Sequence, residues 1–204
     1  KKLSFASYRD LHRWSVTKIA DFWESIWKFC EVRSSVPYSR AMGEAKMPGT
    51  QWFEGARLNF AENLLRYRDA HLALISYGER KSPRQVTYSE LYEEVARIAS
   101  SLKKIGIKPG DRVVGYLPNI PETVIAMLAA TSLGATWSSC SPDFGVQGVI
   151  DRFGQIEPKI LVTIDGYFYN GKEHDCLPRL TEILKTLPTV EKTILIPYRN
   201  KNPE

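Results

Sequence analysis

Apolar residues follow two alternating spacings along the second half of the chain. Short apolar runs bounded by turn residues are typical of buried strands, and apolar positions three or four residues apart are typical of helices. The expected strands are 112–117, 135–139, 160–164 and 193–196. The expected helices between them are 121–133, 146–155 and 177–187. This alternation predicts an α/β fold with a mainly parallel sheet, flanked by helices on both faces and joined by right-handed crossovers.

A further helix is predicted just before these elements. Thr87 and Glu90 have the T-x-x-E spacing in which each side chain bonds the other residue's backbone N–H. Gly106 is expected to end this helix, because glycine readily adopts the left-handed conformation of a helix C-terminus. Upstream, two extended runs at 72–77 and 84–88 flank a polar turn and predict a hairpin or a crossover.

The first 60 residues have a different pattern. A helix is predicted over 17–32, with its aromatic side chains as packing groups, and a connecting loop over 34–50. Asn59 and Glu62 resemble a capping box, which predicts a second helix from about Phe60 to Tyr67. We therefore expect residues 1–50 to be a helical and loop extension that precedes the α/β part.

Composition narrows the class of protein. With 204 residues, 43% hydrophobic and 25% charged, the chain is expected to be globular, with one sizeable domain, two small ones or one incomplete domain. The net charge of +5 comes from 28 basic residues interleaved with 23 acidic ones. No basic stripe is present, so we expect no nucleic-acid partner, whereas a small anionic ligand needs only a local cation and backbone N–H groups.

Cysteine usage and the apolar runs bear on the compartment. Cys30, Cys140 and Cys176 are far apart, without the pairing of a zinc site or of a disulfide-rich secreted domain. No signal-peptide pattern is seen at the N-terminus, and the longest apolar run, 124–135, is too short to span a bilayer. The expectation is a cytosolic (cytoplasmic) protein with no membrane partner.

Three loops follow predicted strands, where ligands bind in open α/β sheets: 118–121, 138–145 and 165–172. In the third, Gly166, Gly171 and Lys172 match a phosphate-binding P-loop, but Glu173 replaces its Ser or Thr. A carboxylate there repels phosphate, so a true P-loop is not expected. A looser anion contact through Lys172 and neighbouring amides remains open.

The other loops suggest no reactive group. In 138–145 we expect Ser141 or Asp143 to cap the next helix and Cys140 to be a buried filler, since no G-x-S-x-G elbow is present. The three histidines are isolated, so no metal site is predicted. No G-x-G-x-x-G fingerprint occurs, and no catalytic residue is assigned within this chain.

Four stretches together resemble the N-terminal part of the acetoacetyl-CoA synthetases, a group of the adenylate-forming acyl-CoA synthetase family. They are WFEGARLNFAEN (52–63), YLPNIPE (116–122), GATWSSCSPDFG (134–145) and DRFGQIEPK (151–159). The resemblance implies that 51–204 is the first part of the family's large α/β domain, which is incomplete here. It also implies that the family's ATP-phosphate loop and C-terminal lysine lie beyond the equivalent of Glu204, in the remainder of the same polypeptide.

The resemblance further implies a ligase reaction of the full-length parent, with acetoacetate, ATP and CoA as substrates and Mg²⁺ as cofactor. The fragment itself is expected to be inactive. At most CoA is expected to contact it, through Asn170, Gly171 and Lys172, which match the family's CoA-phosphate contact except that lysine replaces arginine and cannot form a bidentate fork. The alternatives are a non-catalytic module that binds CoA or another phosphorylated metabolite and, more weakly, a fragment of a dinucleotide-binding dehydrogenase.

Overall fold

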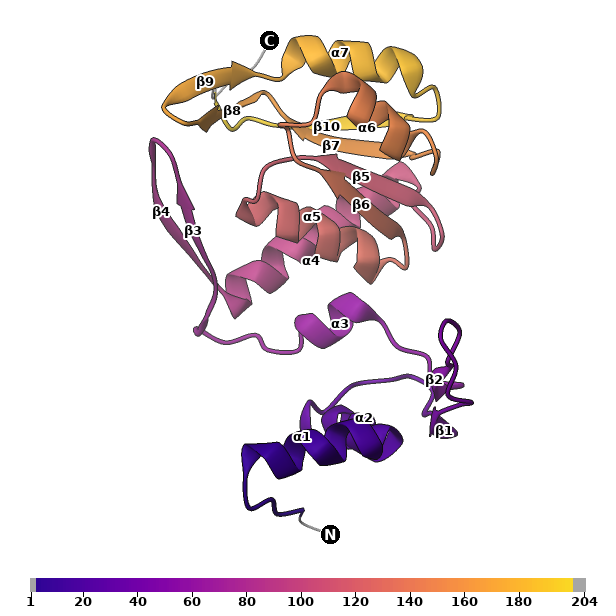
Figure 1. Cartoon of the computed structure of the whole chain (residues 1–204). Coiled ribbons are helices and arrows are strands. Elements are labelled where there is room, and N and C mark those ends of the chain that lie inside the picture. Colours follow the sequence, from indigo (N-terminus) through magenta and orange to yellow (C-terminus); the bar gives the residue numbers. More distant parts are fainter. Residues whose placement is uncertain (1–2, 200–204) are drawn as a thin grey trace. The chain divides into compact units, whose positions relative to one another are not determined.

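The computed structural model describes residues 3–199 of the chain, which divides into two compact units, Lys1–Asn63 and Leu64–Glu204 (Figure 1). The division into 1–50 and 51–204 stays a prediction, and its residues 1–2 and 200–204 lie outside the described part.

The first unit is built from two helices and a small antiparallel pair of strands. Its elements are α1 (Tyr8–Thr17), α2 (Ile19–Phe29), β1 (Arg40–Met42) and β2 (Trp52–Glu54). The helix predicted over 17–32 is present as α2, which ends earlier, at Phe29. The preceding helix α1 was not predicted; Ser7 caps it by accepting a hydrogen bond from the Asp10 N–H. The aromatic residues of α2 do pack: the Trp27 ring lies 4.4 Å from that of Phe53, centroid to centroid.

The short helix α3 (Phe60–Leu64) begins where the sequence predicts. The Glu62 N–H donates to Asn59 Oδ1 at 3.0 Å. This helix ends three residues before the predicted Tyr67.

The second unit opens with an antiparallel hairpin followed by a long helix. Strands β3 (Leu72–Gly78) and β4 (Lys81–Thr87) pair only with each other among the described strands, and α4 (Tyr88–Ile105) follows directly. The predicted capping box is confirmed: the Thr87 N–H donates to Glu90 Oε2 at 2.8 Å and the Glu90 N–H to Thr87 Oγ1 at 3.2 Å. Gly106 ends α4 with a φ of 99°.

A four-stranded parallel sheet forms the centre of this unit. Its strands, in the order β10-β7-β5-β6, are β10 (Lys192–Ile196), β7 (Ile160–Ile164), β5 (Arg112–Tyr116) and β6 (Thr136–Cys140). The connecting helices are α5 (Pro121–Ser132), α6 (Val146–Phe153) and α7 (Leu177–Thr186). Helices α4 and α5 lie on one face and α6 and α7 on the other (Figure 1). The predicted α/β fold is confirmed.

Strand β5 is buried on both faces of this sheet. Val113 and Val114 are fully buried and, as neighbours in a strand, point to opposite sides. Val114 belongs to the core beneath α6 and α7, with Phe153, Leu161 and Ile183. Val113 faces α4 and α5. This two-sided burial explains why residues 113–117 are continuously apolar rather than alternating.

Candidate functional site

The order of the strands reverses at β5. The chain passes from β5 to β6 on one side and then returns to place β7 on the other side of β5. In open α/β sheets, ligands bind outside the carboxyl ends of the strands at such a reversal. A ligand is therefore expected beside the residues that follow Tyr116 and Ile164.

A crevice lies beside this point, beneath the β3–β4 hairpin. Its walls come from the hairpin, from the start of α5 and from the segment after β10. The lining residues are Ser76, Gly78, Lys81, Ser82, Arg84, Ile120, Pro121, Glu122, Pro197 and Tyr198. Lys81 Nζ donates to the Tyr198 carbonyl oxygen at 2.6 Å and lies 4.8 Å from its ring centroid. The ammonium thereby holds the hairpin onto the end of β10.

Asp165, directly after β7, fixes the adjoining backbone. It is fully buried, and its Oδ1 accepts hydrogen bonds of 2.8 Å from the N–H groups of Tyr198 and Arg199. Its carbonyl oxygen accepts from the Cys176 N–H at 3.1 Å, at the start of α7. Through its carboxylate and its backbone carbonyl, Asp165 thus ties together the ends of two strands and the start of a helix.

The loop after β6 is held by a tyrosine. The buried Tyr116 hydroxyl lies 2.9 Å from the carbonyl oxygens of both Pro142 and Phe144. The expectation that Ser141 or Asp143 caps α6 is wrong, because α6 begins at Val146 after Gly145, without a side-chain cap. The Ser141 hydroxyl instead donates to Asp143 Oδ2 at 3.0 Å, which closes the loop on itself.

The thiols near this edge are not activated. Burial raises the pKa of Cys140, and burial raises the pKa of Cys176 to about 11. A nucleophilic cysteine needs a lowered pKa and some exposure. These values favour the prediction of Cys140 as a buried filler and assign no nucleophile to this edge.

The predicted loop at 165–172 is an antiparallel hairpin of β8 (Gly166–Tyr169) and β9 (Lys172–Asp175). A Cβ added to Gly166 would lie 2.4 Å from the His174 carbonyl oxygen on the opposite strand. Glycine is thus required there for strand packing rather than for cradling a phosphate. The expectation that this segment is no P-loop is confirmed.

Asn170 and Gly171 form the turn of this hairpin, and Lys172 begins β9. Both turn residues have a positive φ, 51° and 71°, and their N–H groups donate to one carboxylate, that of Glu79. The two bonds are 2.8 Å long, to Oε1 and Oε2 respectively. Lys172 is exposed, and within residues 3–199 its ammonium forms no hydrogen bond or ion pair.

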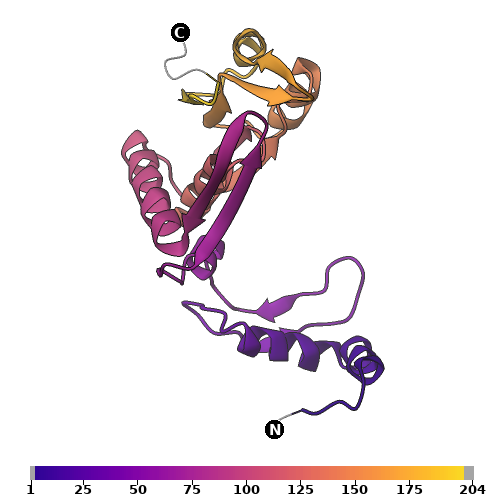
Figure 2. The same cartoon turned by 90° about the vertical axis from the view of Figure 1, so that its left-hand side faces the viewer.

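Glu79 and its neighbour Arg80 were not among the predicted site residues. They lie at the tip of the β3–β4 hairpin, and Arg80 Nη2 donates to the Gly171 carbonyl oxygen at 2.5 Å. Figure 2 shows the hairpin running as an arm alongside the sheet toward β8 and β9. No local sequence signal links residues that are 91 positions apart, so this contact was not predictable.

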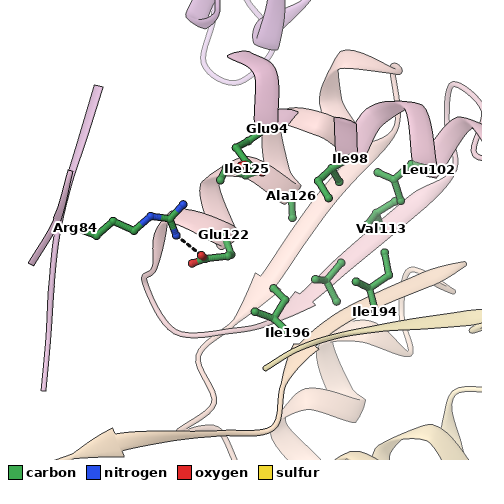
Figure 3. Close-up of a pocket in the computed structure, with 11 residues that line it drawn as sticks. Arg84, Glu94, Ile98, Leu102, Val113, Glu122, Ile125, Ala126, Ile194 and Ile196 are labelled. Carbon is green, nitrogen blue, oxygen red and sulfur yellow. Dashed lines mark hydrogen bonds and ion pairs between the residues drawn. The ribbon is translucent and has the colours of Figure 1, made fainter. Parts of the chain in front are cut away.

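A second hollow, on the face of α4 and α5, is almost wholly apolar (Figure 3). Its lining residues are Arg84, Glu94, Ile98, Leu102, Val113, Glu122, Ile125, Ala126, Val162, Ile194 and Ile196. Arg84 and Glu122 form an ion pair and point toward each other at one end (Figure 3). This hollow offers no convergent donors for a phosphate, and the carboxyl edge of the sheet is the better candidate site.

Within residues 3–199, no group of three or more His, Cys, Asp or Glu side chains is placed to hold a metal ion. Over the same range, every helix is too short or too polar to cross a membrane.

Comparison with known proteins gives two family matches. Residues 60–204 match the family of AMP-binding enzymes, and residues 8–64 match the N-terminus of acetyl-coenzyme A synthetase.

Several of the similar proteins are named acetoacetyl-CoA synthetase. Acetoacetyl-CoA synthetases from Danio rerio and Macaca fascicularis are 47% and 48% identical to this chain over 96% of its length. The solved structure of acetoacetyl-CoA synthetase from Streptomyces lividans matches 99% of this chain with a TM-score of 0.92 and 46% identity. The chain spans 30% of the two curated relatives and 32% of the solved chain.

Proposed function

The chain belongs to the AMP-binding enzyme family, and from that premise we propose that it is the N-terminal part of an acetoacetate–CoA ligase. The proposed reaction of the whole protein converts ATP, acetoacetate and CoA into AMP, pyrophosphate and acetoacetyl-CoA. The observation that carries the proposal is the likeness of nearly the whole chain to proteins named acetoacetyl-CoA synthetase. A cytosolic location goes with this proposal, supported by the unpaired spacing of the three cysteines.

The two proposed steps need no nucleophile from the protein. The acetoacetate carboxylate attacks the α-phosphorus of ATP and expels pyrophosphate, and the CoA thiol then attacks the acyl carbon and expels AMP. Magnesium would offset charge on the phosphates. Residues 3–199 provide no carboxylate cluster that fits the ion, so no step is assigned to it in this part of the chain.

The proposed contribution of this chain to catalysis is a contact with a CoA phosphate at the β8–β9 turn. Asn170, Gly171 and Lys172 are the proposed residues. Lys172 is exposed and without an ionic partner in residues 3–199, whereas the amides of Asn170 and Gly171 are bonded to Glu79. Lys172 is therefore the group of the three that is open to a phosphate.

Calorimetric titration with CoA tests this contact. We expect saturable binding that Lys172→Ala weakens about 2- to 5-fold, as is usual for one exposed charge pair. Lys104→Ala, which removes an exposed lysine from the last turn of α4, is the matched control and should leave the affinity unchanged. Equal affinities of the Lys172→Ala and control variants would exclude the contact.

Pyrophosphate release tests the wider proposal. The 204-residue chain is expected to release no pyrophosphate in the presence of acetoacetate, ATP and Mg²⁺, whereas a protein extended to the length of the relatives should do so. Robust turnover by the 204-residue chain would show that the catalytic groups lie within it. No turnover of acetoacetate by the extended protein would refute the proposed substrate.

A further inference from the structure

The tips of two hairpins meet through one carboxylate and two backbone amides. Glu79 lies in the turn of the β3–β4 hairpin, and Asn170 and Gly171 form the turn of the β8–β9 hairpin. Neither hairpin pairs with the four-stranded sheet. The contact therefore joins two elements that the sheet itself does not hold together.

The amide pair is an anion-binding geometry. Successive backbone N–H groups in a tight turn can point to the same side, where they form a concave site for an anion. Asn170 and Gly171 form such a turn, and each N–H bonds a different oxygen of Glu79. The anion that occupies this site is thus a side chain of the protein itself.

The occupant is charged over the ordinary pH range. Hydrogen bonds from the Gly171 and Asn170 N–H groups lower the pKa of Glu79 below its usual value of 4.5. Bonds from N–H groups to an ionised carboxylate are stronger than those between neutral groups. Arg80 adds a third link, since its guanidinium donates to the Gly171 carbonyl oxygen and lies 5.3 Å from the Phe168 ring centroid.

We propose that Glu79 is an internal competitor for the Asn170–Gly171 amides, so that a phosphate group binds this turn only after the Glu79 carboxylate has moved away. The extension to a CoA phosphate rests on the proposed function. Two N–H groups cannot satisfy a carboxylate and a phosphate at once, and two anions side by side repel each other. Lys172 and Arg80 are the cations that remain beside the turn when Glu79 leaves.

This competition predicts a cost in affinity. When the competent state of a site is only fractionally populated, the apparent Kd rises by the inverse of that fraction. Removal of the Glu79 carboxylate should therefore tighten phosphate binding by about 3- to 10-fold, although it removes a contact from the folded protein. A role of Glu79 in stability alone predicts no gain in affinity.

The first test uses inorganic phosphate and does not depend on CoA. Amide chemical shifts of Asn170 and Gly171 are followed by NMR during phosphate titration of the wild-type chain, Glu79→Ala and Glu79→Gln. We expect phosphate to shift these two amides in both variants at lower concentrations than in the wild type. Glu182→Ala, which removes an exposed carboxylate of α7, is the control and should behave as the wild type. Unchanged phosphate responses in both Glu79 variants would overturn the proposal.

The second test uses CoA and separates this proposal from the proposed function. Tighter CoA binding by Glu79→Gln supports both the competition by Glu79 and the CoA contact, provided that the gain is lost in Glu79→Gln combined with Lys172→Ala. If phosphate shifts the two amides in the Glu79 variants but CoA binds none of the proteins, the CoA contact fails while the competition stands. If CoA binds the wild type and Glu79→Gln equally, the competition fails while the CoA contact stands.

Discussion

The ring of Trp137 on β6 fills the space beside Gly115 on β5. A Cβ added to Gly115 would lie 2.7 Å from Trp137 Cζ2, which is closer than real Cβ contacts. Gly115→Ala should therefore destabilise the chain by about 1–3 kcal/mol, because the ring or the strand must shift. Urea denaturation monitored by circular dichroism measures this loss.

The same pair provides its own control. In a Trp137→Leu background the indole ring that crowds residue 115 is absent. Gly115→Ala should therefore lower the free energy of unfolding clearly less than it does in the wild type. A double-mutant cycle that gives a coupling energy near zero would show that contact with Trp137 does not cause the destabilisation by Gly115→Ala.

The capping box of α4 gives a second prediction. Thr87→Ala removes the acceptor for the Glu90 N–H and should cost about 1 kcal/mol of unfolding free energy. Ser101→Ala in the same helix, whose hydroxyl donates to the Arg97 carbonyl oxygen, should have a smaller effect. Equal losses in the two variants would argue against a cap.

The partner residue of this box predicts a pH dependence. The hydrogen bond from the Thr87 N–H holds the pKa of Glu90 below its usual 4.5. A carboxyl with a depressed folded-state pKa stabilises the protein above its unfolded-state pKa, and this contribution is lost as the pH falls through the folded-state value. Glu90→Gln should therefore be destabilising at pH 7 and nearly neutral well below pH 4.5. A pH-independent difference between Glu90→Gln and wild type would contradict this.

Thiol reactivity gives a third prediction. Cys30 is exposed, whereas Cys140 and Cys176 are buried with raised pKa values. A thiol reagent at pH 8 should modify one cysteine quickly and the other two only after unfolding, because the thiolate is the reactive form. Cys30→Ser should abolish the fast phase. A fast phase that persists in Cys30→Ser would place a reactive thiol in the core.

The buried carboxylate of Asp165 gives a fourth prediction. Asp165→Ala leaves the Tyr198 and Arg199 N–H groups without their acceptor and should cost about 1–3 kcal/mol of unfolding free energy. Asp165→Asn keeps a carbonyl oxygen in place and should cost less. Hydrogen exchange at the Tyr198 amide separates the two, since it should accelerate more in Asp165→Ala.

Much of the second unit was predictable because its signals are local. The Thr87–Glu90 box, Gly106 and the apolar runs of the four parallel strands specify their elements within a few residues. Helix α1 was missed because its residues are polar on average and it begins at Tyr8, before the strongest aromatic run. The β8–β9 hairpin was missed because the glycines at 166 and 171 resemble those of a phosphate loop as well as those of a turn.

The candidate site was predictable only in part. Asn170, Gly171 and Lys172 were selected from the chain alone, and they lie together on one exposed turn. Whether they contact CoA stays a prediction. Glu79 was not selected, because its role depends on how two hairpins meet in space. The sequence of a Glu-Arg turn on a polar hairpin does not indicate which segment the turn contacts.

The reversal of strand order at β5 also affects how the chain is made. Val113 pairs with Trp137 on one side and with Ile160 on the other. During synthesis, β5 and β6 can pair well before β7 has left the ribosome, so one edge of a mostly apolar strand stays open for the time needed to add the intervening residues. Such edges readily join other chains. The nascent protein therefore carries an unpaired β5 edge between the appearance of Cys140 and that of Ile164.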